Sequence, residues 1–118
     1  LINAIQINKQ EVNYFNLLGY AYSINNFSDK AIAAYQMALD LDSENSFAHY
    51  NMGLEFYTQG KNENAVIKLL EAGRFYAKDN NKNKILMVLE TLILLKKNGV
   101  YIKSEEFDYL ESQYYDID

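Results

Sequence analysis

The sequence of 118 residues contains no cysteine and no proline. Without cysteine the chain has no disulfide and no thiolate metal site, and its redox compartment is left open. Without proline, no helix interior has to lose a backbone hydrogen bond or kink. Glycine is also scarce, with five residues, most of them at expected turns and helix contacts. These absences favour a fold built from uninterrupted helices.

The residue types that usually carry out catalysis are scarce too. His49 is the single histidine, and the sequence has no glycine-rich loop followed by Lys-Ser/Thr that would cradle a phosphate. Glu105, Glu106 and Asp108 fall on an expected helix and lack the spacing of a calcium-binding loop. We therefore predict no enzyme activity, no cofactor and no metal site, and we interpret His49 as a packing residue.

Long apolar runs and an excess of basic residues are missing as well. No 18 consecutive residues are apolar, and the most apolar stretch, 85–95, contains Glu90 and Thr91, so it predicts a buried helix and no membrane span. The net charge is −5 and the pI about 4.8, whereas nucleic-acid-binding domains usually carry a basic face and a high pI. We expect neither a membrane nor a nucleic acid as partner. No targeting segment is recognised, so a cytoplasmic location is the default expectation.

What the sequence does contain is an internal repeat. Three pairs of small residues recur at a spacing of 34 positions: Gly19/Gly53, Ala31/Ala65 and Ala38/Ala72. A period of this length is that of one helix–turn–helix repeat. Small side chains allow neighbouring helices to approach closely, while large ones fill the gaps between them. The pattern predicts two stacked helical pairs, over 12–45 and 46–79.

Apolar spacing and turn residues predict where the helices begin and end. The expected helices cover 12–24, 29–41, 46–59, 62–76, 82–97 and 105–115. Ser28 and Ser104 are the expected N-caps of the second and last of these helices. Gly60 is expected to end the third, because glycine tolerates positive φ.

Both ends of the chain depart from the two central units. Residues 1–11 are expected to be the end of a truncated preceding repeat, because Ala4 and Ile7 lie 34 positions before Ala38 and Leu41. Residues 80–118 are expected to form a divergent helical pair that caps the second repeat, since the terminal units of stacked arrays need such covering. In the 34-residue register, the expected glycine of this pair is Met87.

Each central unit resembles a tetratricopeptide repeat, whose pattern is W-x₂-L-G-x₂-Y, then A-x₃-F, then a small residue. The matching residues are Phe15, Leu18, Gly19, Tyr22, Ala31, Tyr35 and Ala38 in the first unit and His49, Met52, Gly53, Phe56, Ala65, Leu69 and Ala72 in the second. The sequence departs from the pattern at Ser43 and Ala77, where the family often has proline. The resemblance covers residues 1–79 and implies an all-α fold of antiparallel helical hairpins, stacked as a right-handed superhelix.

The resemblance also implies a function, the binding of another protein. In the family, the first helix of each unit lines a concave groove through a fixed set of positions. On this chain they hold Asn13, Asn16, Leu17, Tyr20, Ser23 and Ile24, then Phe47, Tyr50, Asn51, Leu54, Tyr57 and Thr58. We therefore expect a scaffold whose uncharged groove, rich in aromatic and amide side chains, docks a peptide segment of a protein partner. A clamp for chaperone carboxylates is not expected, because Asn16 and Tyr20 replace the family's lysine and asparagine.

Other interpretations of the same pattern stay open. In one, the groove holds the chain's own next element or a second copy, which makes the chain a structural or self-association module. In another, the chain is the sensor half of a peptide-responsive regulator. A rival site is the basic cluster formed by Arg74, Lys78, Lys82, Lys84, Lys96, Lys97 and Lys103. These side chains either are solvated and attract the acidic last helix, or they bind an acidic partner segment.

Overall fold

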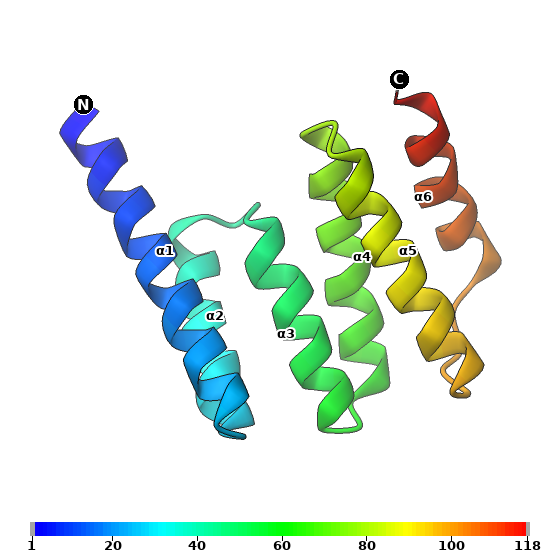
Figure 1. Ribbon diagram of the computed structural model, residues 1–118, viewed down its shortest axis with the longest axis horizontal. Helices are drawn as coiled ribbons and strands as arrows, with labels where there is room; N and C mark the ends of the chain where they lie inside the picture. Colours follow the sequence, from blue (N-terminus) through cyan, green and yellow to red (C-terminus); the bar gives the residue numbers. More distant parts are fainter. Residues whose placement is uncertain (1, 118) are drawn as a thin grey trace.

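The computed structural model describes residues 2–117, with side chains from residue 8 onward, and this part of the chain forms six helices and no strand. They are α1 (Ile2–Ile24), α2 (Ser28–Leu41), α3 (Ser46–Thr58), α4 (Asn62–Lys78), α5 (Lys82–Lys97) and α6 (Ser104–Asp116). Consecutive helices run antiparallel; α1 passes in front of α2, and α5 in front of α4 (Figure 1). The all-α fold of stacked helical hairpins is confirmed. None of the described helices is long and apolar enough to cross a membrane.

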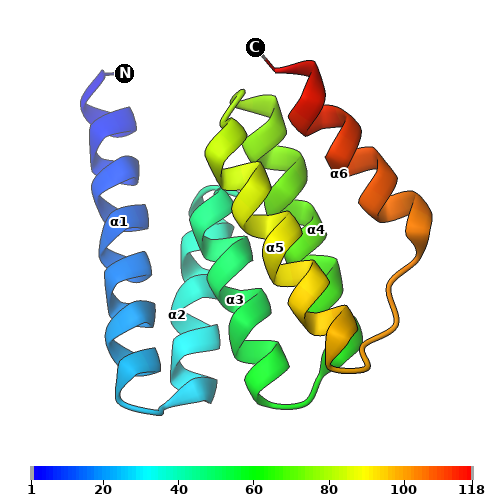
Figure 2. The ribbon, with the colours of Figure 1, turned by 45° about the vertical axis from the view of Figure 1, so that its right-hand side comes forward.

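The helices contact one another mainly in the order of the chain. α2 packs against both α1 and α3, and α4 packs against α3, α5 and α6. α3 therefore lies between α1 and α5, as the two views in Figures 1 and 2 show. This arrangement places the first helices of the three pairs, α1, α3 and α5, next to one another in sequence order.

The repeated alanines are buried in the cores between the helices. Ala31 and Ala38 of α2 and their counterparts Ala65 and Ala72 of α4 have no exposed surface at all. A larger side chain at any of these positions would have to push a neighbouring helix away.

The repeated glycines show that both pairs close in the same way. A Cβ on Gly19 of α1 would lie 2.6 Å from the ring of Tyr35 in α2. A Cβ on Gly53 of α3 would lie 2.9 Å from Cγ of Leu69 in α4. Tyr35 and Leu69 are themselves 34 positions apart, so the contact that requires glycine recurs in the same register.

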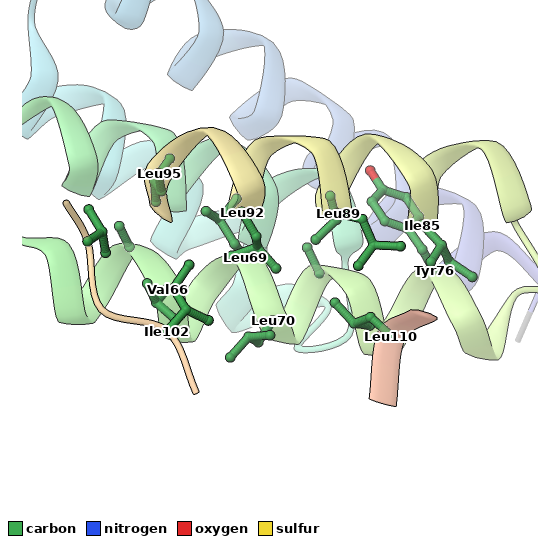
Figure 3. Packing of buried hydrophobic residues seen from close by; sticks show 14 residues of the cluster. Val66, Leu69, Leu70, Tyr76, Ile85, Leu89, Leu92, Leu95, Ile102 and Leu110 are labelled. Carbon is green, nitrogen blue, oxygen red and sulfur yellow. The ribbon is translucent and has the colours of Figure 1, made fainter. Parts of the chain in front are cut away.

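The larger hydrophobic core lies between α4, α5 and the segment leading into α6 (Figure 3). Val66, Leu69 and Leu70 of α4 face it, together with the buried row of α5. Leu110 is the buried residue of α6, and it packs against Gly73 of α4, where a Cβ would lie 2.7 Å from its Cδ2. α5 and α6 thus cover the side of α4 that faces away from α2, while their role as a terminal cap stays a prediction.

The first helix differs from the expectation. The expected helix start at residue 12 is absent, because α1 continues without a break from Ile2 to Ile24. That residues 1–11 are the end of a truncated preceding repeat stays a prediction. The sequence explains this continuity, since the segment from Asn8 to Glu11 contains neither glycine nor proline. The side chains of Ala4 and Ile7, on which the expectation rested, lie outside the described residues.

The N-caps differ from the expectation as well. Ser28 and Ser104 are the first residues of α2 and α6, and neither of these helices has a side-chain cap. Asparagines supply the caps instead: Asn45 Oδ1 accepts the backbone N–H of Ala48 at 3.0 Å at the start of α3, and Asn81 caps α5 in the same way. The hydroxyl of Ser28 donates to Glu55 of α3 instead.

The turns that close the two pairs use the left-handed backbone conformation. Gly60 has a φ of 76°, as expected for a glycine that follows a helix. Asn26 lies 34 positions earlier and has a φ of 64°. Asparagine tolerates this region better than most residues, so the two turns are equivalent although their residues differ.

Candidate functional site

The surface between α1 and α3 is hollowed next to the start of α3. The hollow has a volume of about 380 Å³ and is lined by Asn13, Asn16, Leu17, Asn45 and Phe47. All of these except Asn45 belong to the groove that the sequence predicts. The structure thus brings together predicted residues from two helices that are separated by about one repeat.

Asn16 forms the floor of the hollow and is oriented by its neighbours. Its Nδ2 donates to Asn45 Oδ1 at 3.1 Å, and the same oxygen accepts the N–H of Ala48 as the cap of α3. Because that oxygen is already an acceptor, Asn16 must present its NH₂ group to it. The side chain is 7% exposed. Asn16 therefore ties α1 to α3 beneath the surface and does not project from it.

An exposed and mainly apolar row of side chains runs along α1 from the hollow toward the end of the helix. Leu17, Tyr20 and Ile24 are 69%, 52% and 65% exposed, and their spacing of three and four residues places them in one row along the helix. Asn13 lies in the same row and is exposed. None of these four side chains is charged, so this row of the predicted groove is available and neutral.

Two predicted groove tyrosines on α3 are turned toward α5. The hydroxyl of Tyr50 lies 2.8 Å from that of Thr91. Since the Thr91 hydroxyl donates to the carbonyl of Met87, Tyr50 is the donor of this bond. Asn98 Nδ2 donates to the hydroxyl of Tyr57 at 3.0 Å. Both rings are half-buried against the larger core. They join α3 to α5. Their main role is therefore to hold the two helices together, not to contact a partner.

The remaining predicted residues of α3 lie partly exposed between these walls. Phe47 is 42% exposed and meets the ring of Tyr35 edge-on, with 6.4 Å between centroids. Leu54 is half-buried. Asn51 Nδ2 donates to the carbonyl of Phe47 in its own helix at 2.9 Å, and the hydroxyl of Thr58 donates to the carbonyl of Leu54 at 3.0 Å. The polar groups of α3 are thus largely engaged within the helix.

Sequence reasoning predicted the helix α5 but not its groove residues, because the third pair has a different register. Asn45 and Asn81 occupy the N-cap positions of α3 and α5 and lie 36 residues apart. In this register the counterpart of Gly53 is Leu89, which is buried, and the expectation of Met87 was wrong. The sequence does contain a signal of this shift: Asn81, the N-cap of α5, lies two positions later than the 34-residue period predicts.

With this register, α5 continues the surface of α1 and α3. Leu86, Ile93 and Leu94 occupy groove positions and are 38%, 49% and 55% exposed. Glu90 lies between them on the same side and is exposed. It has no ion pair within residues 2–117. The apolar surface therefore extends over three helices and carries one acidic group on α5.

A second polar cluster lies at the other end of α3 and joins three helices. Glu55 is 7% exposed and accepts hydrogen bonds from the hydroxyls of Ser23 and Ser28, the latter at 2.8 Å. Gln59 Nε2 donates to Ser28 Oγ at 3.0 Å and to Asp29 Oδ1 at 2.7 Å. This cluster could not be predicted from the sequence, because nothing in the spacing shows that Glu55 is buried. The cluster removes Ser23 from the predicted contact surface.

The buried carboxylate of this cluster affects its aromatic neighbour. Burial raises the pKa of Tyr35 to about 12, and the carboxylate of Glu55 and the phenol of Tyr20 act in the same direction. The phenol of Tyr35 is therefore neutral throughout the physiological range and serves as a packing group beneath the site.

Part of the rival basic cluster is used inside the chain. The ammonium of Lys82 lies 4.7 Å from the centroid of the Tyr114 ring and donates to the carbonyl of Ile117 at 3.1 Å. The ammonium of Lys96 lies 5.3 Å from the centroid of the Phe107 ring. These contacts attach α6 to α5 through cation–π interactions. Lys82 and Lys96 thus contact aromatic rings of α6 and a backbone carbonyl after it, not the carboxylates of α6.

His49 lies in the aromatic position of the repeat and is 3% exposed. Its Nε2 lies 2.8 Å from the carbonyl of Ser43, so this nitrogen is the donor, and its ring stacks on Phe75 with 5.3 Å between centroids. Its Nδ1 lies 3.2 Å from a carboxylate oxygen of Glu71. The ring thus connects α3, α4 and the turn before α3. Within the described residues, no three histidine, cysteine or acidic side chains are grouped as metal ligands.

Comparison with known proteins adds one finding. The family model described as "TPR repeat" matches residues 28–60. The matched segment contains α2, α3 and the turn between them, and it ends at the glycine with positive φ. No curated protein matches the sequence.

Proposed function

We propose, from the premise that this chain is a tetratricopeptide-repeat protein, that it is a scaffold binding a peptide segment of a partner protein on the surface formed by α1, α3 and α5. Tetratricopeptide repeats are generally modules for protein–protein interaction, and stacked helical pairs present their first helices on a concave face. The single observation that carries the proposal is the hollow between α1 and α3, which four predicted groove residues line.

The exposed apolar row next to the hollow supports the proposal. Leu17, Tyr20 and Ile24 are each more than half exposed. Single exposed apolar side chains are ordinary, but a contiguous group of them on a folded surface usually marks a site of interaction. Aromatic and aliphatic side chains held on a rigid helix provide contact area at a small cost in conformational entropy.

The members of the proposed site have different tasks. Those that project, and would contact the peptide, are Asn13, Leu17, Tyr20, Ile24, Phe47, Asn51 and Leu54. Asn16, Tyr50 and Tyr57 hold the three helices in place through their hydrogen bonds. Variants of the first group test binding, whereas variants of the second group would also disturb the fold.

The experiment is a selection of linear peptides of about 16 residues, which are long enough for four helical turns, from a random library displayed on phage. Leu17→Asp places a charge in the exposed row. Met37→Asp is the matched control, because Met37 is 48% exposed on α2, outside the proposed surface. Loss of a contact that dominates binding costs about 2 kcal/mol, or about 30-fold in Kd. We expect that loss for Leu17→Asp and unchanged binding for Met37→Asp.

Two results of the peptide selection would contradict the proposal. One is a selection that yields no peptide binding the wild-type chain. The other is binding that Leu17→Asp leaves unchanged, which would place the site elsewhere. Light scattering during size-exclusion chromatography identifies self-association: a dimer that Leu17→Asp converts to a monomer would show that a second copy covers this surface instead of a peptide.

A further inference from the structure

We infer that the segment bound on this surface is an amphipathic helix with an uncharged apolar stripe, rather than an extended peptide. The inference rests on the proposed function and specifies the chemistry of the partner. It depends on which polar groups of α1, α3 and α5 are still available, and on where the exposed apolar side chains lie.

An extended peptide needs polar partners along its whole length. Its backbone N–H and C=O groups are unpaired, and burying them without hydrogen bonds is costly. A groove that binds such a peptide therefore has to offer donors and acceptors at its centre. Two amides of the predicted groove, Asn16 and Asn51, stand in central positions for this task.

Each of these amides already uses one of the two N–H donors of its NH₂ group within the chain. Asn16 is buried and donates to Asn45, and Asn51 donates to the backbone of its own helix. The hydroxyl of Tyr50 donates to Thr91. Asn13 remains exposed at the edge of the hollow. The centre of the surface therefore provides few donors for the carbonyl groups of an extended backbone.

A bound helix does not need polar partners for its backbone, because its backbone hydrogen bonds are internal. It needs apolar surface that matches side chains at positions i, i+3, i+4 and i+7. The surface supplies this in two exposed rows, one on each side of α3. The row on α1 consists of Leu17, Tyr20 and Ile24, and the row on α5 of Leu86, Ile93 and Leu94.

The two rows face the same side of the molecule. In the register of 34 residues from α1 to α3 and 36 from α3 to α5, Leu94 is the counterpart of Ile24, and Leu86 and Ile93 are the counterparts of two other groove positions of α1, Asn16 and Ser23. α3 lies between them in both views (Figures 1 and 2). The half-buried Leu54 of α3 connects the rows. The apolar stripe of a partner helix would lie over α3, flanked by both rows.

Glu90 adds one electrostatic requirement. It is the charged residue among the groove positions of α1, α3 and α5, it is exposed, and it has no ion pair within the described chain. A basic residue beside the apolar stripe of the partner complements it. An exposed pair of this kind contributes up to about 1 kcal/mol, so it favours one orientation of the helix more than it adds affinity.

The test uses the peptides selected from the random library as probes. We expect an apolar spacing of i, i+3 or i+4 and i+7, with a basic residue beside the stripe. The ¹³Cα chemical shifts of a labelled peptide should become helical when it binds. Proline at a solvent-facing central position should weaken binding by about 100-fold, because it breaks the helix at a cost of about 3 kcal/mol. Alanine at the same position is the matched control and should leave binding unchanged.

The outcomes separate this inference from the proposed function. Peptides that require Leu17 but bind in an extended form, with alternating apolar residues and tolerance of proline, would overturn the helix and leave the groove in place. Peptides that ignore Leu17→Asp would overturn the groove itself. Glu90→Gln should weaken binding by about fivefold at most and reduce the preference for a basic residue. An unchanged preference would contradict the role of Glu90.

Discussion

Ala65 has no exposed surface, and its carbonyl oxygen would lie 3.1 Å from a Cβ on Gly53 of the neighbouring helix. Because Ala65 is fully buried, a longer side chain at this position has to displace its neighbours. Ala65→Leu should therefore destabilise the fold by about 1–3 kcal/mol through overpacking. Asn62→Leu introduces the same side chain at the exposed start of α4 and should cost much less. Urea unfolding measures both, and equal losses would mean that the repeat register is wrong.

Tyr35 predicts how stability responds to alkaline pH. Its pKa is raised from the ordinary 10.0 to about 12 in the folded chain. The folded state therefore holds the phenolic proton at pH values where the unfolded chain has lost it. The contribution of the protonated Tyr35 phenol to folding stability is fully present below pH 10 and is lost as the pH rises toward 12.

The matched test compares two phenylalanine variants. Tyr35→Phe removes the titrating group, so its urea midpoint should fall less steeply than that of the wild type over the same pH range. Tyr115→Phe changes a tyrosine that is 71% exposed and should follow the wild type. If the urea midpoints of Tyr35→Phe and the wild type fall in parallel as the pH rises, the pKa of Tyr35 is not raised in the folded chain.

Among the helices, the sequence predicted the pairs well and their ends less well. Recurring small residues located both central pairs, because close packing constrains size strongly at positions such as Gly19 and Ala38. The caps could not be read in the same way, because serine and asparagine are nearly equivalent there. Only the fold shows that Ser28 bonds to Glu55 while Asn45 is free to cap α3.

The last two helices, α5 and α6, cover the apolar face of α4. Removing residues 80–118 would expose Val66, Leu69 and Leu70, which α5 and α6 now cover. Because an array of two repeats without a cap leaves its core open, we expect aggregation or loss of cooperative unfolding. Size-exclusion chromatography and thermal unfolding measure this. A soluble, monomeric and cooperatively folding fragment 1–79 would show that α5 and α6 are an independent appendage.

At the scale of the whole molecule, the family pattern predicted which helix faces form the candidate site, and the fold decided which side chains are available there. Leu17 and Tyr20 project as expected, since no neighbouring helix covers their side of α1. Asn16 and Tyr50 do not, because each is held by a residue from another helix. Such partners lie far apart in sequence. The contribution of α5 was hidden by a shift of two residues in register.

The distribution of charge over the molecule separates the uncharged surface from the basic cluster. Lys82 and Lys96 are unsuitable for testing the cluster, because they attach α6. Lys84 and Lys103 are exposed and make no side-chain contact of this kind within the described chain. Lys84→Glu and Lys103→Glu therefore test whether the basic cluster binds the partner without loosening the fold.

The most direct measurement is the Kd of a selected peptide at low and at high salt, for the wild type, Leu17→Asp and the double variant Lys84→Glu/Lys103→Glu. Attraction between exposed charges is screened beyond about 8 Å at physiological ionic strength, whereas apolar contact is not. Binding on the surface of α1, α3 and α5 predicts a Kd that changes little with salt, rises about 30-fold in Leu17→Asp and stays unchanged in the double variant. A Kd that rises steeply with salt and with the double variant, and is indifferent to Leu17→Asp, would contradict it.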